Sequence, residues 1–383
     1  MVSNPVAVLF ILAAVVYVSL KLEERSSVFR KLGAALVGIL LGMVLSNVGL
    51  LPGNSPAYEF LVGPGVSASV VLILLSVDIR SIRNAGPVML KAFAIGAVGT
   101  AIGSMLMAAL LFPAIGPETW KLSGQFTGTY TGGGMNFAAL AQALHTDNDL
   151  FTAAIAADVL VTAVWLIACL VAPLLLGNKV ENTSQPVDAA SPPETGDLTL
   201  EKSLYSSGRP VSLEHFAALT GLTIGAMVFA EKLASWFSFL PEVLWLTTIA
   251  LCVAQIPAVK KMSGGAMLGN YMLLLFLASN GAQSVVANII KVGHSVLFYA
   301  MGTVAIHGLI IFSIGRLLRI DAGTLAVASQ ANVGGPASAM ALASARGYAN
   351  QVLPGVAAGL LGYAVGNYLG LAVASVMKGF LLN

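Results

Sequence analysis

The sequence predicts an all-α polytopic membrane protein made of two inverted repeats, each with five transmembrane helices and one glycine-rich re-entrant hairpin. Three observations predict this fold: the chain is very apolar, a polar linker divides it, and matching glycine-rich segments occur in both halves. Of the 383 residues, 57% are hydrophobic and 9% are charged, whereas a soluble domain carries about 25% charged residues. The net charge of +2 indicates no polyanionic partner. The composition therefore excludes a soluble enzyme, a nucleic-acid-binding protein and a disordered protein.

Ten apolar segments approach the roughly 20 residues that a helix needs to cross a bilayer. They lie at 5–20, 32–51, 59–77, 87–115, 151–177, 214–230, 242–258, 266–288, 293–315 and 354–377. The stretch 178–213 is rich in acidic residues and proline and has no apolar periodicity. This composition predicts a flexible polar linker on the cytoplasmic side. The linker separates a first repeat at 1–177 from a second repeat at 214–383.

Two further segments, at about 123–144 and 323–345, are rich in Gly, Ser, Thr and Asn. The first contains three consecutive glycines, 132–134, and each costs about 1 kcal/mol relative to Ala inside a helix, which predicts an unwound turn. In the second, Pro336 after two glycines suits the first position of a new helix. Each arm spans about half of the hydrocarbon core, so we expect both tips near the midplane. The alternative is that the glycines only allow close helix packing.

The distribution of Lys and Arg tests whether the first segment crosses the membrane, because these residues collect in cytoplasmic loops. If both glycine-rich segments cross, the 19 cations divide almost evenly between the two sides. If both turn back, only Lys121, Lys232, Lys291 and Lys378 lie outside, and the other fifteen lie inside. This bias predicts a re-entrant first segment in the cell (inner) membrane, with both termini outside and the linker inside. The second hairpin depends on the repeat alone, because a crossing there merely exchanges Arg346 for Lys378.

The two hairpin tips form the predicted binding site. Helix N-termini that enter from opposite sides favour an anionic group such as a carboxylate, and unwound carbonyls with neutral side chains offer oxygen ligands to alkali ions. The candidate substrate-binding residues are Thr129, Thr131, Gly133, Gly134, Asn136, Gln330, Asn332, Gly334, Gly335 and Ser338. The candidate sodium ligands are Asn136, Asp158 and Asn332.

Three polar features inside apolar runs have two interpretations each. Asp158 is the only acidic residue well inside such a run, which predicts an ion or proton site; the alternative is a carboxylate that faces water near a helix end. His307 is interpreted as a hydrogen-bonded structural histidine rather than a proton relay. A polar face made of Ser279, Asn280, Gln283 and Asn288 either lines a pathway or holds helices together by hydrogen bonds, and the sequence leaves both open.

A resemblance to a known family is carried by the run Gly128-Thr-Tyr-Thr-Gly-Gly-Gly-Met-Asn-Phe-Ala-Ala-Leu-Ala-Gln-Ala-Leu144 and the Ala-Ala-Asp158 after it. The chain resembles the YjcL-like (DUF819-type) family of integral membrane proteins of unknown function over essentially its whole length. Its architecture is more distantly similar to the glutamate:sodium symporters and the 2-hydroxycarboxylate transporters. Those families imply a static scaffold domain, a mobile domain that carries the hairpins, elevator-type movement, sodium coupling and carboxylate substrates. Their scaffold domains often form homodimers, so a homodimer is an expectation here.

We therefore expect an ion-coupled secondary transporter, with sodium as the coupling ion, for a small organic anion or zwitterion. Its partners would be the solute and the lipid bilayer. We expect no enzyme and no cofactor besides sodium, because the phosphate loop of ATPases and the His-Glu-x-x-His and Gly-x-Ser-x-Gly motifs are missing. One alternative is a sodium/proton antiporter in which broken helices cross the membrane and Asp158 exchanges the ions. Another is a membrane receptor or assembly factor that works through its linker.

Overall fold

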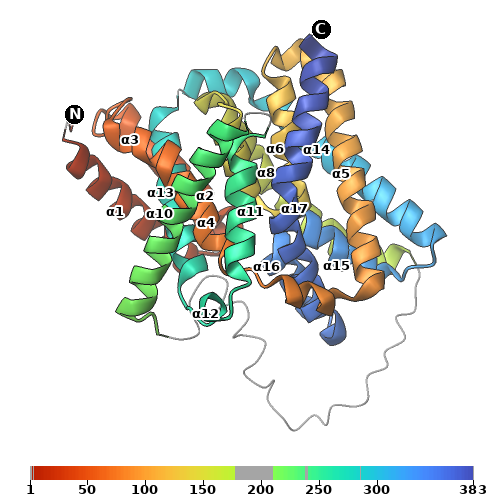
Figure 1. The fold of residues 1–383 in the computed structure, drawn as a ribbon. Helices are drawn as coiled ribbons and strands as arrows, with labels where there is room; N and C mark the ends of the chain where they lie inside the picture. Colours follow the sequence, from red (N-terminus) through yellow and green to blue (C-terminus); the bar gives the residue numbers. More distant parts are fainter. Residues whose placement is uncertain (1, 3, 177–209, 238–239, 285, 383) are drawn as a thin grey trace.

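The computed structural model describes residues 2, 4–176, 210–237, 240–284 and 286–382 (Figure 1). These residues form helices joined by short connections, and none of them lies in a β-strand. Seven helices of this described part are long and apolar enough to cross a membrane. Most of the linker predicted at 178–213 lies outside the described residues.

The helices divide into two bodies that lie side by side, each with elements from both halves of the chain (Figure 1). We call the first the flanking body, and α13 packs at its centre against α2 and α4. Its elements are α1 (Pro5–Arg25), α2 (Ser27–Asn47), α3 (Pro56–Phe60), the π-helix η1 (Leu61–Gly65), α4 (Val66–Leu74), α10 (Leu213–Trp236), α11 (Glu242–Ala254), α12 (Pro257–Lys260) and α13 (Gly265–Gln283).

We call the second body the hairpin body, and its most extensive packing joins α5 to α14 and α6 to α17. Its elements are the 3-10 helix η2 (Ile79–Ala85), α5 (Gly86–Ile115), α6 (Thr119–Gly132), α7 (Gly134–Ala143), α8 (Asn148–Leu175), α14 (Val286–Leu317), α15 (Ala322–Val333), α16 (Gly335–Ala345) and α17 (Ala349–Leu382). The two bodies touch much less extensively, mainly where α2 meets α8, α4 meets α7 and α11 meets α17.

Local sequence explains where several of these helices begin. Asn4, Asp147 and Asp321 each precede a helix and accept hydrogen bonds from backbone N–H groups of its first turn. The bond to Asn4 measures 2.8 Å, as does the one to Asp321. Such caps satisfy N–H groups that have no partner inside the helix.

Three of the ten expected spans are shorter or less apolar than the sequence suggests. Within α2, Gly33 has a φ of 74° and so interrupts the regular helix near its start. The helix α11 ends at Ala254, shortly before Pro257, which cannot continue a helix. The side-chain amide of the next residue, Gln255, donates to the Val77 carbonyl at 3.1 Å. The third, α13, has 19 residues and carries several polar side chains.

The glycine-rich segments form two antiparallel helix pairs, α6 with α7 and α15 with α16. The first pair turns at Gly133 and the second at Gly334. In the first pair Gly128 lies against Leu140, and Gly124 lies against Leu144, as expected when the chain reverses direction. The pairs extend over 119–143 and 322–345, close to the predicted 123–144 and 323–345.

Both pairs lie on one glycine-lined face of α17. Along this face Gly370 meets Gly124, Gly366 meets Gly128 and Gly362 meets Gly132, while Gly359 meets Pro336 and Gly355 meets Val327. A Cβ atom at any of these α17 positions would overlap the facing helix. The first pair therefore approaches the middle of α17 from one end and the second pair from the other (Figure 1).

Candidate functional site

The turns of the two helix pairs meet beside α17. A Cβ atom added to Gly335 would lie 3.3 Å from the Gly132 carbonyl oxygen, and one added to Gly133 would lie 3.9 Å from the Gly335 Cα. Tyr363 of α17 lies beside both turns. Its Cε1 would be 3.4 Å from a Cβ atom added to Gly133 and 3.8 Å from one added to Gly335. Since α7 and α16 begin here, two helix N-termini with unpaired N–H groups share one place.

Gly133 makes the first turn possible. Its φ of 102° lies in the region that side chains other than glycine's strongly disfavour. Its N–H still donates to the Thr129 carbonyl at 2.6 Å, which ends α6. The break expected from three consecutive glycines is thus present at the middle one, and Gly134 begins α7.

Two buried side-chain amides beside the turns keep atoms that have no hydrogen-bond partner among the described residues. Asn136 donates from Nδ2 to the Gly362 carbonyl at 3.1 Å, which leaves its Oδ1 unpaired. Gln330 lies against Gly334, and neither its Oε1 nor its Nε2 is paired. Because an unpaired buried polar group costs about 1–3 kcal/mol, these atoms are candidate contacts for a bound solute or water.

The predicted hydroxyl residues lie on the arms next to the turns. The Thr131 hydroxyl donates to the Thr127 carbonyl of its own helix at 2.7 Å, so its proton is already engaged while its oxygen can still accept. Thr129 is buried one helical turn before Gly133. Ser338 borders Gly334, where an added Cβ would lie 2.6 Å from the serine oxygen.

Asn332 points away from the meeting point and joins α15 to α5. With its amide oriented to satisfy its neighbours, its nitrogen donates to the Phe93 carbonyl at 3.2 Å and to the Ala328 carbonyl at 3.1 Å. Gly96 of α5 leaves the space that this side chain fills, because a Cβ there would overlap it. The geometry gives Asn332 a role in attaching the second pair, which the sequence did not indicate.

Asp158 lies on α8 beside the end of the first pair. Its carboxyl neighbours the Tyr130 hydroxyl of α6 and the Thr162 side chain one turn along α8. The carboxyl oxygen Oδ1 is buried, and neither it nor the Tyr130 hydroxyl forms a hydrogen bond of ordinary geometry with a described residue. Because Tyr130 stands two residues before Gly132, this carboxyl lies close to the first turn rather than in bulk water.

His307 of α14 is fully buried and hydrogen-bonded at both ring nitrogens. Its Nδ1 lies 2.8 Å from the Gly96 carbonyl, which can only accept, so Nδ1 carries the proton. Its Nε2 therefore accepts from the Ser329 hydroxyl at 2.9 Å, and that oxygen accepts in turn from the Trp165 Nε1–H at 2.9 Å. This geometry agrees with the structural interpretation of His307.

The same histidine connects the two helix pairs. Thr100 of α5 lies 3.0 Å from the His307 Nδ1 and donates its own proton to the Tyr130 carbonyl at 2.9 Å. Tyr130 belongs to the first pair, and Ser329, on the other side of the ring, belongs to the second. A continuous buried hydrogen-bond chain therefore holds both arms in a defined relation.

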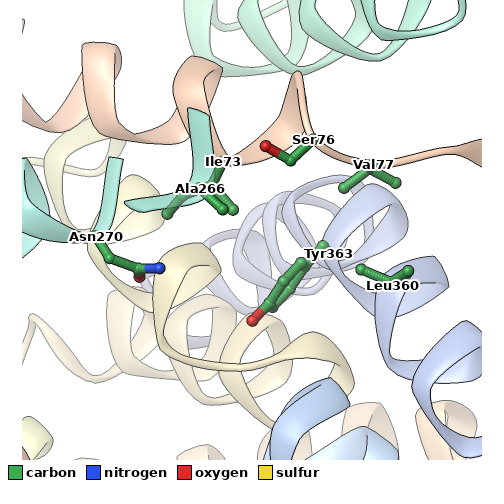
Figure 2. A pocket seen from close by; sticks show the side chains of 7 residues that line it. All are labelled: Ile73, Ser76, Val77, Ala266, Asn270, Leu360 and Tyr363. Carbon is green, nitrogen blue, oxygen red and sulfur yellow. The ribbon is translucent and has the colours of Figure 1, made fainter. Parts of the chain in front are cut away.

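A small cavity separates the meeting point from the flanking body. Its volume is about 20 Å³, enough for about one water molecule. Figure 2 shows Asn270 of α13 and Tyr363 of α17 facing it from different bodies. The remaining lining residues are Ile73, Ser76, Val77, Ala266 and Leu360.

Two larger cavities flank α7, and both have Gln142 and His145 in their walls. One, of about 350 Å³, lies towards α8 and α13, and the other, of about 310 Å³, lies towards α11. Gln142 separates them and donates to the Gly63 carbonyl of η1 at 2.9 Å. These volumes lie in the lower range for small-molecule sites, and one polar side chain ties the arm between them to the flanking body.

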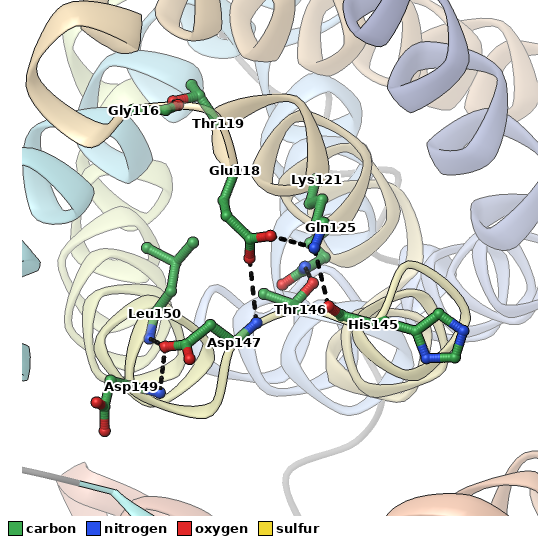
Figure 3. A network of polar contacts seen from close by, with 10 residues as sticks. All are labelled: Gly116, Glu118, Thr119, Lys121, Gln125, His145, Thr146, Asp147, Asp149 and Leu150. Carbon is green, nitrogen blue, oxygen red and sulfur yellow. Dashed lines mark hydrogen bonds and ion pairs between the residues drawn. The ribbon is translucent and has the colours of Figure 1, made fainter.

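A polar network joins the two open ends of the first pair (Figure 3). Lys121 pairs with Glu118 and also donates to the His145 carbonyl at 2.9 Å. The other oxygen of Glu118 accepts from the Asp147 N–H at 3.2 Å. The chain that enters α6 and the chain that leaves α7 therefore lie together at one end of the hairpin body.

The polar face of α13 contacts a neighbouring helix and also borders a cavity, while a pathway along it stays a prediction. Asn280 donates to the Thr152 hydroxyl of α8, and Ser284 lies 2.6 Å from that same hydroxyl. Asn280 and Gln283 also line the cavity of about 350 Å³. These side chains thus join the two bodies at the wall of a cavity.

Comparison with known proteins identifies the family. A family model described as "Protein of unknown function (DUF819)" matches residues 7–380. The chain belongs to the DUF819 family. It is similar to the uncharacterized membrane protein YjcL of Bacillus subtilis (strain 168), with 28% identity over 378 residues that cover 95% of this chain and 94% of YjcL. Family membership confirms the resemblance found in the sequence, and the apolar helices make this DUF819 protein a multi-pass membrane protein.

Sequence reasoning missed three features that shape the site of this DUF819 protein. The first is Tyr363, which stands in an apolar run without any local signal. The second is the glycine face of α17, whose spacing of three and four residues from 355 to 370 is visible in the sequence and typical of close helix packing. The third is Tyr130, which lies inside the glycine-rich segment yet becomes informative only through its contact with Asp158.

Proposed function

We propose that this DUF819 protein is a sodium-coupled secondary transporter of a small organic anion or zwitterion, held between the turns of the two helix pairs. The observation that carries the proposal is the meeting of these turns beside buried amide atoms without partners. Two helix N-termini supply positive dipole ends for an anionic group. The free amide of Gln330 and the free Oδ1 of Asn136 supply a donor and two acceptors for the polar part of the solute.

The network in Figure 3 supports a re-entrant first pair. Because Lys121 and His145 touch, the segment leaves and returns at one end of the body. A broken helix that crosses the membrane, as the antiporter alternative requires, would place these two residues at opposite ends. Backbone that leaves the helix at membrane depth is tolerated where protein covers it, and the two turns pack against each other and against α17.

The order of elements supports inverted repeats and a movement of the elevator type. Helices α5 to α8 and α14 to α17 both run as a long helix, a short pair and a long helix. Their pairs approach α17 from opposite ends, as inverted repeats in secondary transporters do. The hairpin body is internally well packed and touches the flanking body over a smaller area, so a sliding movement would break few contacts.

Ligand-induced stabilisation tests the proposal on the purified full-length chain. Succinate, citrate, glutamate and alanine are added in sodium chloride, potassium chloride or choline chloride, and melting is followed by tryptophan fluorescence. A solute at about 100 times its Kd stabilises the folded state by about 2.7 kcal/mol. Gln330→Leu should abolish the shift, whereas Gln351→Leu, at the distant base of the second pair, should retain it.

Uptake of the stabilising solute into proteoliposomes completes this test. We expect uptake that depends on an ion gradient and survives deletion of residues 184–208. If no probe solute stabilises the protein or is taken up in any ion background, the transporter proposal is wrong. If stabilisation persists while the linker deletion alone abolishes function, the receptor alternative is favoured.

Topology is tested with single cysteines in a background without Cys169 and Cys252. Lys121→Cys and Asp147→Cys should react with a membrane-impermeant maleimide from the same side of the membrane. Labelling from opposite sides would show that the first pair crosses the membrane, and the site between the turns would have to be abandoned.

A further inference from the structure

Asp158 is a membrane carboxyl whose buried oxygen Oδ1 has no hydrogen-bond partner of ordinary geometry among the described residues. The hydroxyl of the neighbouring Tyr130 is also buried, and among the described residues it too lacks a hydrogen bond of ordinary geometry, although it lies close to the Asp158 carboxyl. By contrast, the equally buried His307 and Tyr299 have partners for their polar atoms, with the Tyr299 hydroxyl 3.1 Å from the Ser104 hydroxyl. A buried carboxyl oxygen and a nearby hydroxyl that form no hydrogen bond of ordinary geometry indicate a place for a further group beside them.

The charge balance at Asp158 indicates that the missing group is a cation. The ion pairs of the described residues are Lys21–Glu24, Lys121–Glu118 and Lys260–Asp78, and none of them involves Asp158. The polar side chains that face its carboxyl, Tyr130 and Thr162, are uncharged. A carboxylate inside a membrane protein without a counter-charge is costly and is typical of ion sites.

We infer that Asp158, Tyr130 and Thr162 form a sodium site beside the first turn, which deepens and rests on the transporter function proposed above. A carboxylate and two hydroxyl oxygens are hard ligands that suit an alkali ion. One negative charge balances one monovalent ion. Within the described residues, His, Cys, Asp and Glu form no group of three that could hold a transition metal.

The position of this site explains how sodium would act on the solute site. Tyr130 precedes the turn at Gly133 by three residues, and its carbonyl accepts a hydrogen bond from Thr100. An ion on the Tyr130 hydroxyl therefore joins the last turn of α6 to α8 and orders the turn at Gly133, where the solute contacts begin. In this assignment Asn332 is not a sodium ligand, because its amide is engaged with α5.

Sodium-dependent melting of the full-length protein tests the assignment without any solute. Sodium chloride replaces choline chloride at constant ionic strength, with potassium chloride as a third condition. We expect wild type to be stabilised by sodium more than by potassium. Asp158→Asn should lose this shift, and Tyr130→Phe should weaken the apparent sodium affinity by about tenfold, the usual loss when a contact to a charged group is removed.

Tyr299→Phe is the matched control. Tyr299 is as buried as Tyr130, and both rings stack on Phe126, with centroids 5.2 and 5.5 Å away. Its hydroxyl already has a partner in Ser104, so its removal should leave the sodium response intact. Asp78→Asn, which removes a carboxylate at the end of α4, serves as the control for Asp158→Asn.

Each outcome decides the assignment. Sodium shifts that vanish in Asp158→Asn, weaken in Tyr130→Phe and persist in both controls support it. A wild type that sodium does not stabilise, or variants that respond like wild type, overturns it. Stabilisation by acid without any sodium effect also overturns it, because the carboxyl then holds a proton. If solute uptake continues in sodium-free medium, the sodium site and the sodium coupling are wrong, whereas transport of the solute between the turns stands.

Discussion

Gly362→Ala tests the close contact between α17 and the first helix pair. In the structure Gly362 lies directly against the last turn of α6. A Cβ at this position would lie 2.6 Å from the Gly132 Cα and 3.1 Å from the Thr131 carbonyl carbon, and still closer to the carbonyl oxygen. These are backbone atoms, and α6 cannot retreat from them because it packs against α5 on another side.

The change in stability caused by Gly362→Ala is the sum of a gain in helix propensity and a cost of steric overlap. Replacing Gly by Ala inside a helix gains about 1 kcal/mol, whereas forcing an extra methyl group into a packed interface costs about 1–3 kcal/mol. Gly225→Ala in α10 is the control that has only the gain in helix propensity, because nothing lies within 4 Å of its added Cβ. The difference between the two variants therefore isolates the clash, and we expect Gly362→Ala to be less stable by about 1–3 kcal/mol.

Thermal unfolding at one fixed scan rate is the assay, because membrane proteins often unfold irreversibly. Gly225→Ala should melt at or above the wild-type temperature and Gly362→Ala below it. Gly362→Ala should also weaken any solute-dependent shift, since Gly362 accepts the Asn136 amide at the turn. If Gly362→Ala melts as high as Gly225→Ala, the contact is looser than described and the reasoning fails.

Three further predictions concern other polar contacts. Gln142→Leu should remove the tie between α7 and η1, worth about 1 kcal/mol, and speed amide hydrogen exchange in α7; unchanged exchange would contradict a role in holding this arm. His307→Phe should leave the Ser329 hydroxyl and a buried carbonyl without their partner and destabilise the protein by about 2–3 kcal/mol in thermal melts; a smaller loss than for a surface histidine variant would refute this. Burial alone would raise the pKa of Asp78, but Lys260 at 2.5 Å and a backbone N–H hold that pKa below its usual value. The pair therefore stabilises the protein above about pH 4, and this stabilisation is lost as the pH falls through the lowered pKa. Because Asp78 is 42% exposed, the stabilisation should be about 1 kcal/mol or less. When melting temperatures are measured over a pH series, Lys260→Met should remove this pH-dependent contribution.

The features that could be predicted from the sequence depend on residues that are close to one another along the chain. Apolar runs indicate helices in a membrane, and consecutive glycines indicate a helix break. The break indeed occurs at Gly133, the middle of three. The linker at 178–213 stays a prediction, because most of it lies outside the described residues between the end of α8 and the start of α10.

The features that could not be predicted depend on contacts between distant parts of the chain. Asn332 resembles a ligand in the sequence because it stands next to the second turn, but its amide is used by α5, more than 200 residues earlier. Asp158 could be singled out by its apolar surroundings, whereas its neighbour Tyr130 could not. The fold determines which hydrogen-bond partners a polar side chain has inside a membrane protein, and residue type alone does not reveal those partners.

The two helix pairs differ in what surrounds them. The first touches the flanking body through α7, at α4 and α11, whereas α15 and α16 pack mainly against helices of their own body. Under the proposed function, the second pair could therefore be altered to accept another solute without redesigning the contacts between the two bodies. In the proposed transport cycle, changes in α7 would affect both the solute site and the movement between the bodies.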